Sequence, residues 1–166
     1  MITPLLAPSS MAMPGPCDAI LDTNVVLDWL VFDDPRFAPL GAAVSRGDLR
    51  WIASQAMLDE LIHVLQRPGL EAWQDNLKPA LTCAESTCSI VDAAVLSAGP
   101  GLICSDSSDQ KFIDLAISRR TPWLLTRDKA LLRLARRAKA CGVDVCTPAA
   151  WCAQTTELAA GHELRG

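Results

Sequence analysis

The sequence lacks the long apolar run that would cross a membrane and the basic leader that would direct secretion. Although 50% of its 166 residues are hydrophobic, no stretch approaches the roughly 18 charge-free apolar residues of a spanning helix. Residues 1–16 contain no Lys or Arg and only a short apolar run interrupted by prolines, which excludes an ordinary signal peptide. We expect a soluble, cytoplasmic protein whose residues 1–16 form a disordered tail, unless Met11 or Met13 is the true start.

Paired cysteine ligands are missing as well. The seven cysteines form no Cys-x-x-Cys pair, and only two histidines could help them to hold zinc. Cysteine in apolar surroundings behaves as a small hydrophobe, so unpaired, buried thiols in a reducing compartment explain this composition better than a structural zinc site does.

Basic residues are fewer than acidic residues in this chain. The chain has 15 Lys and Arg against 19 Asp and Glu, a formal net charge of −4. Proteins that bind nucleic acid through bulk positive charge normally have a basic stripe or a high pI, so this mode is disfavoured. A nuclease with an acidic centre stays possible, because divalent cations bound to acids invert the local field that a phosphate meets.

What the chain does contain is an alternation of short apolar runs and helical patterns. Apolar runs at residues 19–21, 51–53 and 123–125 predict strands, Val143-Asp144-Val145 predicts a last short strand, and Ser89–Val95 is a further candidate. We expect the helix after residue 128 to continue to a C-cap at Gly142, and a last helix from about Pro148. The pattern predicts a three-layer α/β/α fold with a mostly parallel central sheet, in which residues 17–166 form one domain.

Acidic residues stand where two of these strands end. Asp22 directly follows the first run, and Asp128 follows the run at 123–125 after two further residues. Open α/β sheets bind ligands at the carboxyl ends of their strands, where these carboxylates should lie a few ångströms apart. Their repulsion would raise at least one pKa unless a cation lay between them, and Mg²⁺ prefers such oxygen ligands. This arrangement suits phosphodiester cleavage.

Four motifs, in this order, resemble those of the PIN-domain nucleases, a family that includes toxins of the VapC type. They are LDTNVVLDWL with Asp22 and Asn24, SQAMLDELIHVLQRP with Glu60, CSDSSDQKFIDLAIS with Asp109, and LLTRDKALL with Thr126 and Asp128. The resemblance covers about residues 17–150, and the strand and helix contexts agree with those expected above.

The resemblance implies a ribonuclease that depends on Mg²⁺ or Mn²⁺. Asp22, Asp109 and Asp128 would hold the metal directly or through water, and Glu60 would be an outer metal ligand or orient a water. Asn24 and Thr126 would orient these carboxylates through hydrogen bonds; as a helix cap and a turn residue they would have ordinary local roles instead. The resemblance also implies RNA as the substrate, a homodimer, and an antitoxin as partner if the chain is the toxin of a toxin–antitoxin pair.

Two assignments stay open. Asp106 is an alternative to Asp109 as a metal ligand, although Ser107 and Gln110 fit a capping box that would place Asp109 in the first helical turn. Cationic residues near Asp128 could contact phosphate or could be ordinary solvated side chains; they are Arg127 and Lys129.

Other functions fit parts of the pattern. A catalytically silent PIN-like module would bind RNA or protein without cutting, although retention of all four acids argues against it. An aspartate-based phosphatase or phosphotransferase usually needs a second Asp two residues after the first, where Asn24 stands here.

Overall fold

A computed structural model describes residues 15–92 and 101–163, with side chains up to residue 156. Its centre is one five-stranded sheet in the order β3-β2-β1-β4-β5, in which every neighbouring pair is parallel. The strands are β1 (Cys17–Leu21), β2 (Leu49–Ala53), β3 (Ser89–Ile90), β4 (Trp123–Leu125) and β5 (Asp144–Cys146). Most of the expected N-terminal tail, residues 1–14, lies outside the described residues.

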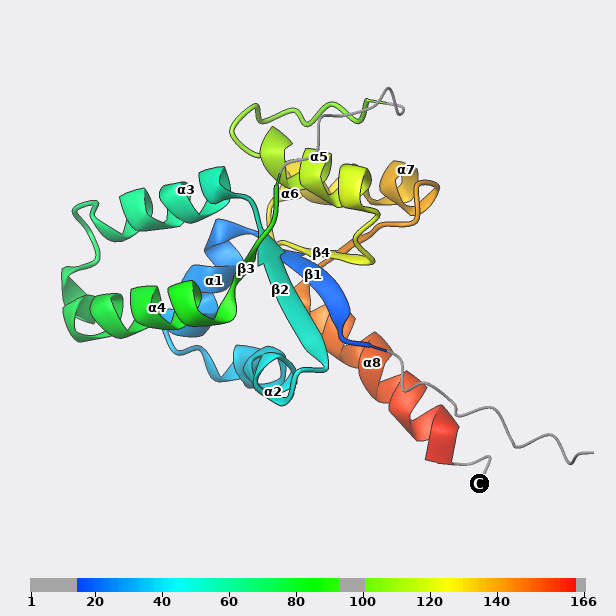
Figure 1. Ribbon diagram of the computed structural model, residues 1–166, viewed down its shortest axis with the longest axis horizontal. Coiled ribbons are helices and arrows are strands. Elements are labelled where there is room, and N and C mark those ends of the chain that lie inside the picture. The colour runs from blue at the N-terminus through cyan, green and yellow to red at the C-terminus, as the bar shows by residue number, and fades with distance from the viewer. Residues whose placement is uncertain (1–14, 93–100, 164–166) are drawn as a thin grey trace, which may run out of the picture.

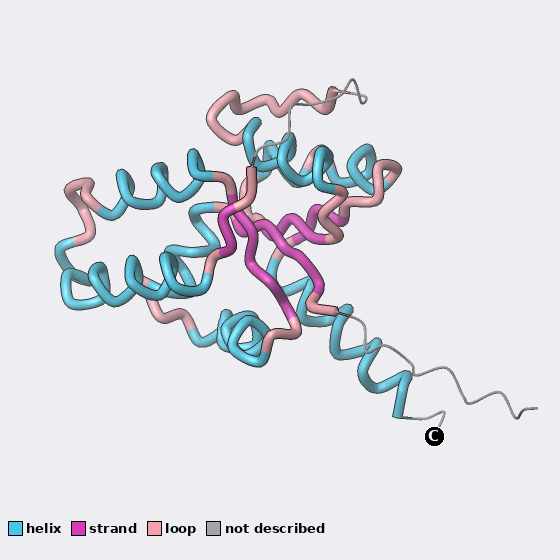
Figure 2. Tube along the Cα trace, in the orientation of Figure 1, coloured by secondary structure: helices cyan, strands magenta, loops and turns pink. Residues whose placement is uncertain are grey.

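Helices lie on both sides of the strands (Figure 2). In the described ranges they are α1 (Thr23–Leu30), α2 (Ala38–Arg46), α3 (Gln55–Leu65), α4 (Gln74–Thr87), α5 (Gln110–Arg119), α6 (Lys129–Leu132), α7 (Ala135–Lys139) and α8 (Pro148–Glu163), with 3₁₀ turns at Pro35–Phe37 and Glu71–Trp73. Figure 1 shows α3 and α4 as a helical hairpin to one side of the sheet. No helix in these ranges is long and apolar enough to cross a membrane.

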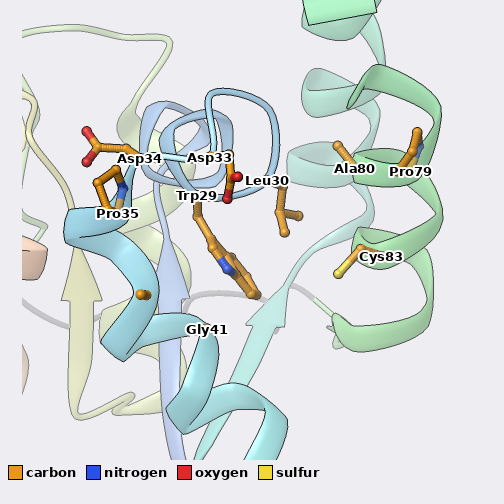
Figure 3. Close-up of a pocket in the computed structure, with 10 residues that line it drawn as sticks. Trp29, Leu30, Asp33, Asp34, Pro35, Gly41, Pro79, Ala80 and Cys83 are labelled. Atoms are coloured by element: carbon orange, nitrogen blue, oxygen red, sulfur yellow. The ribbon is translucent and has the colours of Figure 1, made fainter. Parts of the chain in front are cut away.

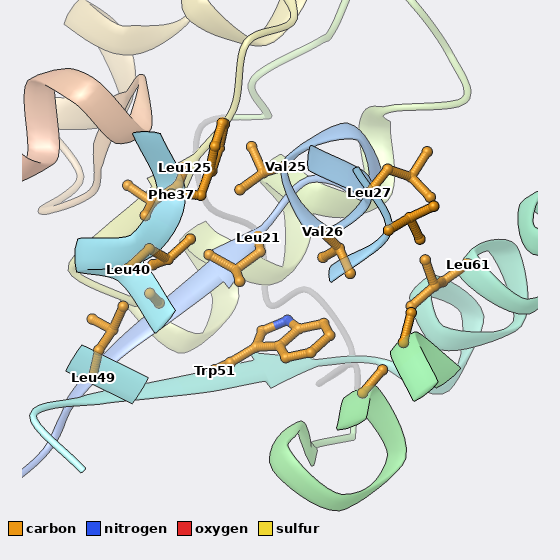
Figure 4. Packing of buried hydrophobic residues seen from close by; sticks show 14 of the residues in the cluster. Leu21, Val25, Val26, Leu27, Phe37, Leu40, Leu49, Trp51, Leu61 and Leu125 are labelled. Carbon is orange, nitrogen blue, oxygen red and sulfur yellow. The ribbon is translucent and has the colours of Figure 1, made fainter. Parts of the chain in front are cut away.

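Two apolar clusters hold the layers together, because successive side chains of a strand point to opposite faces of the sheet. On β1, Leu21 joins the cluster that packs against α1, α2, α3, α4 and α8, whereas Ile20 joins the cluster against α5, α6 and α7. In Figure 4, Leu21 lies between Leu40 of α2 and Trp51 of β2 in the first cluster. The sheet is therefore buried on both faces, and the predicted three-layer α/β/α fold is confirmed.

The order of the strands reverses at β1, which lies in the middle of the sheet. From β1 the chain proceeds to β2 and β3 on one side, and it then returns to β4 and β5 on the other. Leu21 is in register with Leu125, and the Asp22 amide donates to the Leu125 carbonyl at 3.0 Å. Asp22 and Thr126 therefore leave the sheet side by side, at the switch point where open α/β sheets form a ligand crevice.

Two of the expected elements differ in extent from the structure. The helix expected up to Gly142 is broken between α6 and α7, where the Leu134 amide donates to the Leu131 carbonyl in the tighter i→i−3 pattern. Leu131, Leu134 and Ala138, on the two sides of the break, are all buried in one core cluster. Gly142 then has the left-handed φ of 83° that the sequence predicts for it. Only the start of the extended segment expected at residues 89–95 is seen, as β3, and residues 93–95 lie outside the described part.

Candidate active site

Asp22 is a buried carboxylate at the middle of the carboxyl edge of the sheet. It is 2% exposed and caps α1, where its Oδ1 accepts from the Asn24 amide at 3.4 Å. Burial raises the pKa of Asp22, hydrogen bonds from Thr126 and the Asn24 amide lower it, and the charges of Asp128 and Glu60 raise it again. The site therefore holds an acid that is costly to ionise without a nearby cation.

Thr126 joins the two acids that follow the strands. Its fully buried hydroxyl donates to Asp22 Oδ2 at 2.8 Å and accepts from the Asp128 amide at 2.9 Å. A hydroxyl has one hydrogen to give, and here Asp22 receives it. Thr126 is thus placed to orient Asp22, whereas the exposed Asn24 contacts Asp22 through its backbone amide.

Asp128 leaves one carboxylate oxygen for another partner. It is the N-cap of α6, and its Oδ1 accepts from the Ala130 amide at 2.6 Å and from the Leu131 amide at 3.2 Å. Both bonds use the same oxygen. They fix the carboxylate beside Thr126 without consuming Oδ2.

Asp109 reaches the same cluster from α5. It is at the N-cap position, but its side chain makes no capping hydrogen bond. The pKa of Asp109 is raised to about 6 by burial first, then by the charges of Asp22, Asp128 and Asp106, with Lys111 acting in the opposite direction. The structure therefore brings Asp109 close enough to Asp22 and Asp128 for their charges to be felt.

Asp106, the alternative to Asp109, is engaged within its own loop. Its Oδ1 accepts from the Ser108 amide at 2.9 Å and from the Ser108 hydroxyl at 2.7 Å, and the side chain is exposed. These hydrogen bonds lower the pKa of Asp106. The geometry favours Asp109 over Asp106 as the third acid of the cluster.

The capping box expected at Ser107 and Gln110 is wrong. The Gln110 side chain instead accepts from the Cys104 amide at 2.8 Å and donates to the Leu102 carbonyl at 2.7 Å. It thereby satisfies the backbone of the preceding loop, and α5 begins at Gln110 itself. Asp109 consequently lies just before the helix rather than in its first turn.

Glu60 lies at the cluster with both carboxylate oxygens occupied. The Thr23 hydroxyl donates to Oε1 at 2.7 Å, and the Lys111 ammonium pairs with Oε2. The sequence motifs do not single out Thr23 or Lys111 as partners of Glu60. One signal for Lys111 existed: a lysine in the first turn of a helix is disfavoured by the helix dipole, so a compensating acid was to be expected.

The two cations predicted as phosphate contacts differ in their surroundings. Arg127 Nη2 lies 2.5 Å from Asp28 Oδ2, and the Asp28 side chain is 9% exposed while that of Arg127 is 49% exposed. Burial raises the pKa of Asp28, and the charge of Arg127 lowers it. Arg127 is therefore held beside Asp128 with part of its guanidinium open to solvent, whereas Lys129 is simply exposed.

A separate pocket of about 360 Å³ lies between α1, α2 and α4 and includes Trp29, Asp33 and Asp34 (Figure 3). In Figure 3 the Asp34 carboxylate points away from Trp29. Hydrogen bonds from Arg36 lower the pKa of Asp34 to about 2. Asp34 pairs with Arg36 and caps the following 3₁₀ turn, and the pocket is lined by none of the four acids of the cluster.

The donor chemistry of the cluster fits a hard divalent cation. Asp109 lacks a capping partner and Asp128 offers one oxygen. Burial first, and the charges of neighbouring acids second, raise the pKa values of Asp22 and Asp109, and a cation bound there would favour their charged forms. In the described part of the chain, no three His, Cys, Asp or Glu side chains already meet as a metal-holding group. Metal binding would therefore draw these side chains closer together.

Comparison with known proteins agrees with the fold. A family model described as a PIN domain matches residues 18–130, a segment that covers more than half of the chain and includes all four acids. None of the curated proteins compared matches the chain. The chain belongs to the PIN domain family, whose members are usually nucleases.

Proposed function

We propose that this protein is a metal-dependent endoribonuclease that hydrolyses RNA phosphodiester bonds, with Mg²⁺ or Mn²⁺ held by Asp22, Asp109 and Asp128. One observation carries the proposal. Asp22 and Asp128 follow neighbouring strands at the switch point of the sheet, and Asp109 lies near enough that their charges add to burial in raising its pKa to about 6. Membership of a family of nucleases supports the reaction class.

A divalent cation in this place would ease the deprotonation of water and stabilise negative charge on a phosphate. The residues of the chain would fix the geometry. Thr126 holds Asp22 in one orientation, and the α6 amides hold Asp128. Rigid carboxylates of this kind place a reacting phosphate with little loss of entropy at the moment of reaction.

Cleavage of a labelled single-stranded RNA tests the proposal. We expect cleavage with Mg²⁺ or Mn²⁺ and none with EDTA. The resemblance implies that water oxygen joins phosphorus, the bond from phosphorus to O3′ breaks, and O3′ takes the proton, which leaves 5′-phosphate and 3′-hydroxyl ends. Cutting that persists in EDTA or leaves 2′,3′-cyclic phosphates would not be metal-dependent hydrolysis and would count against the proposal.

Arg127 is proposed to contact a phosphate of the RNA. Its guanidinium is anchored by the buried Asp28 and half exposed beside Asp128. We expect Arg127→Gln to raise KM for RNA about tenfold, which is the worth of one charge-assisted hydrogen bond, and to leave Mn²⁺ affinity unchanged. Arg136→Gln removes an equal charge from an exposed position on α7 and serves as the control. Equal increases of KM in the two variants would show that RNA binding depends on the net charge of the protein and not on a contact from Arg127.

A catalytically silent module remains the second candidate, because no metal-holding group is already assembled in the described residues. It predicts that titration with Mn²⁺ gives no heat of binding. The role of toxin in a toxin–antitoxin pair, the antitoxin partner, the homodimer and the cytoplasmic location are proposed from the family resemblance. Growth arrest on expression of the protein, lost in the Asp22→Asn variant, would support the toxin role.

A further inference from the structure

Lys111 places a positive charge inside the acidic cluster. Its ammonium pairs with Glu60 Oε2, and the two side chains are 25% and 29% exposed, respectively. In the ranges that the structure covers, no other Lys or Arg forms an ion pair with any of the four acids. The cluster therefore already has one counterion that belongs to the chain itself.

Several contacts hold this ion pair in place. The Lys111 ammonium also donates to the Ser108 carbonyl and lies 5.0 Å from the centre of the Phe112 ring. The other oxygen of Glu60 accepts from the Thr23 hydroxyl at 2.7 Å. These contacts link α3 to the loop that carries Asp109 and to the residue that follows Asp22.

The position of Lys111 is not favoured by its own helix. Lys111 is in the first turn of α5, where the helix dipole repels a cation. The neighbouring acids compensate for this cost. A divalent cation placed at the same acids would repel the ammonium and compete with it for the same carboxylate oxygen.

We propose that Lys111 is an internal counterion that competes with the divalent cation for Glu60, so that Glu60 joins the metal site only when the Lys111–Glu60 ion pair opens. This inference rests on the proposed metal-dependent function. Lys111 is then a positioning residue. It keeps the acids together when no metal is bound, and the cost of opening the ion pair weakens the apparent affinity for the metal.

Calorimetric titration of the chelator-treated full chain with Mn²⁺ tests this proposal through a double-mutant cycle. We expect Lys111→Met to bind Mn²⁺ roughly three- to tenfold more tightly, as the loss of one partly exposed ion pair and one repelling charge implies. Glu60→Gln should change the affinity of the wild type less than about twofold, because the cost of opening the ion pair offsets what Glu60 contributes as a ligand. In the double variant the gain from Lys111→Met should largely disappear.

Lys129→Met is the matched control. It removes the same charge next to Asp128, from an exposed side chain that forms no ion pair among the described residues. We expect it to change Mn²⁺ affinity less than about twofold. Thermal melts in EDTA show whether each variant is folded; if Lys111→Met does not fold, Lys111→Gln, which keeps a donor for the Ser108 carbonyl, replaces it in the cycle.

The outcomes separate the two proposals. If neither the wild type nor any variant binds Mn²⁺, the proposed metal site is wrong. If the wild type binds Mn²⁺ and the Lys111 variant binds it equally or more weakly, or if the gain persists fully in the double variant, the metal site stands and the counterion proposal is overturned.

Discussion

Asp22→Asn is expected to lower Mg²⁺-dependent RNA cleavage by at least about 10³-fold while the protein stays folded, because it removes one charged ligand of the metal. The substitution keeps the shape of the side chain, and the amide oxygen can still accept from Thr126. Burial and like charges raise the pKa of Asp22, so a neutral amide relieves a cost that the wild type bears without metal. We therefore expect a melting temperature in EDTA that equals or exceeds that of the wild type.

Asp18→Asn is the matched control for this experiment. Asp18 belongs to β1, the strand that Asp22 follows, but it lies near the other end of that strand and pairs at the surface with Arg50 at 2.6 Å. The same chemical change there should leave cleavage close to the wild-type rate. Cleavage by Asp22→Asn at the wild-type rate would show that the reaction does not need Asp22. Equal losses of cleavage in both variants would point to damage to β1 rather than to a lost metal ligand.

The strand-end acids could be predicted from the sequence, because the features that place them are local. A short apolar run determines a buried strand, and parallel strands share one carboxyl edge. Asp22 directly follows one such run, and Asp128 follows another after two residues. The sequence pattern therefore predicted that both acids lie at the carboxyl edge of the sheet. That the two acids are neighbours joined by the Thr126 hydroxyl could not be predicted, because it depends on the strand order, which places β4 beside β1.

The surroundings of Glu60 and Asp109 could not be predicted in the same way. The Thr23 hydroxyl and the Lys111 ammonium meet Glu60 across three helices that are distant in the sequence, so no spacing rule connects them. The start of α5 was also misjudged, since Gln110 bonds to the preceding loop instead of completing a capping box. Local patterns identified the acids, whereas the partners of those acids depended on tertiary packing.

Asp109→Asn is expected to stabilise the metal-free protein above about pH 6 and to have almost no effect near pH 4. The pKa of Asp109 is raised from 3.8 to about 6, so the folded protein retains a proton that the unfolded chain has lost. The wild type therefore loses stability as pH rises from about 4 to about 6. Asparagine removes this loss. Urea unfolding in EDTA should therefore show that Asp109→Asn raises the free energy of unfolding at pH 8 by about 1–2 kcal/mol, after allowance for solvent screening.

Divalent metal should reverse the sign of this effect, because Mn²⁺ stabilises the wild type by binding and Asp109→Asn removes a ligand. Asp106→Asn in the same loop provides the opposite control. Hydrogen bonds from Ser108 lower the pKa of Asp106, so the stability that this carboxylate contributes is present above about pH 4 and is lost on acidification. Its replacement should therefore destabilise the protein at neutral pH. A gain for Asp109→Asn that does not depend on pH, or a gain of equal size for Asp106→Asn, would show that the cost of ionising Asp109, from burial and from the neighbouring acids, is not its source.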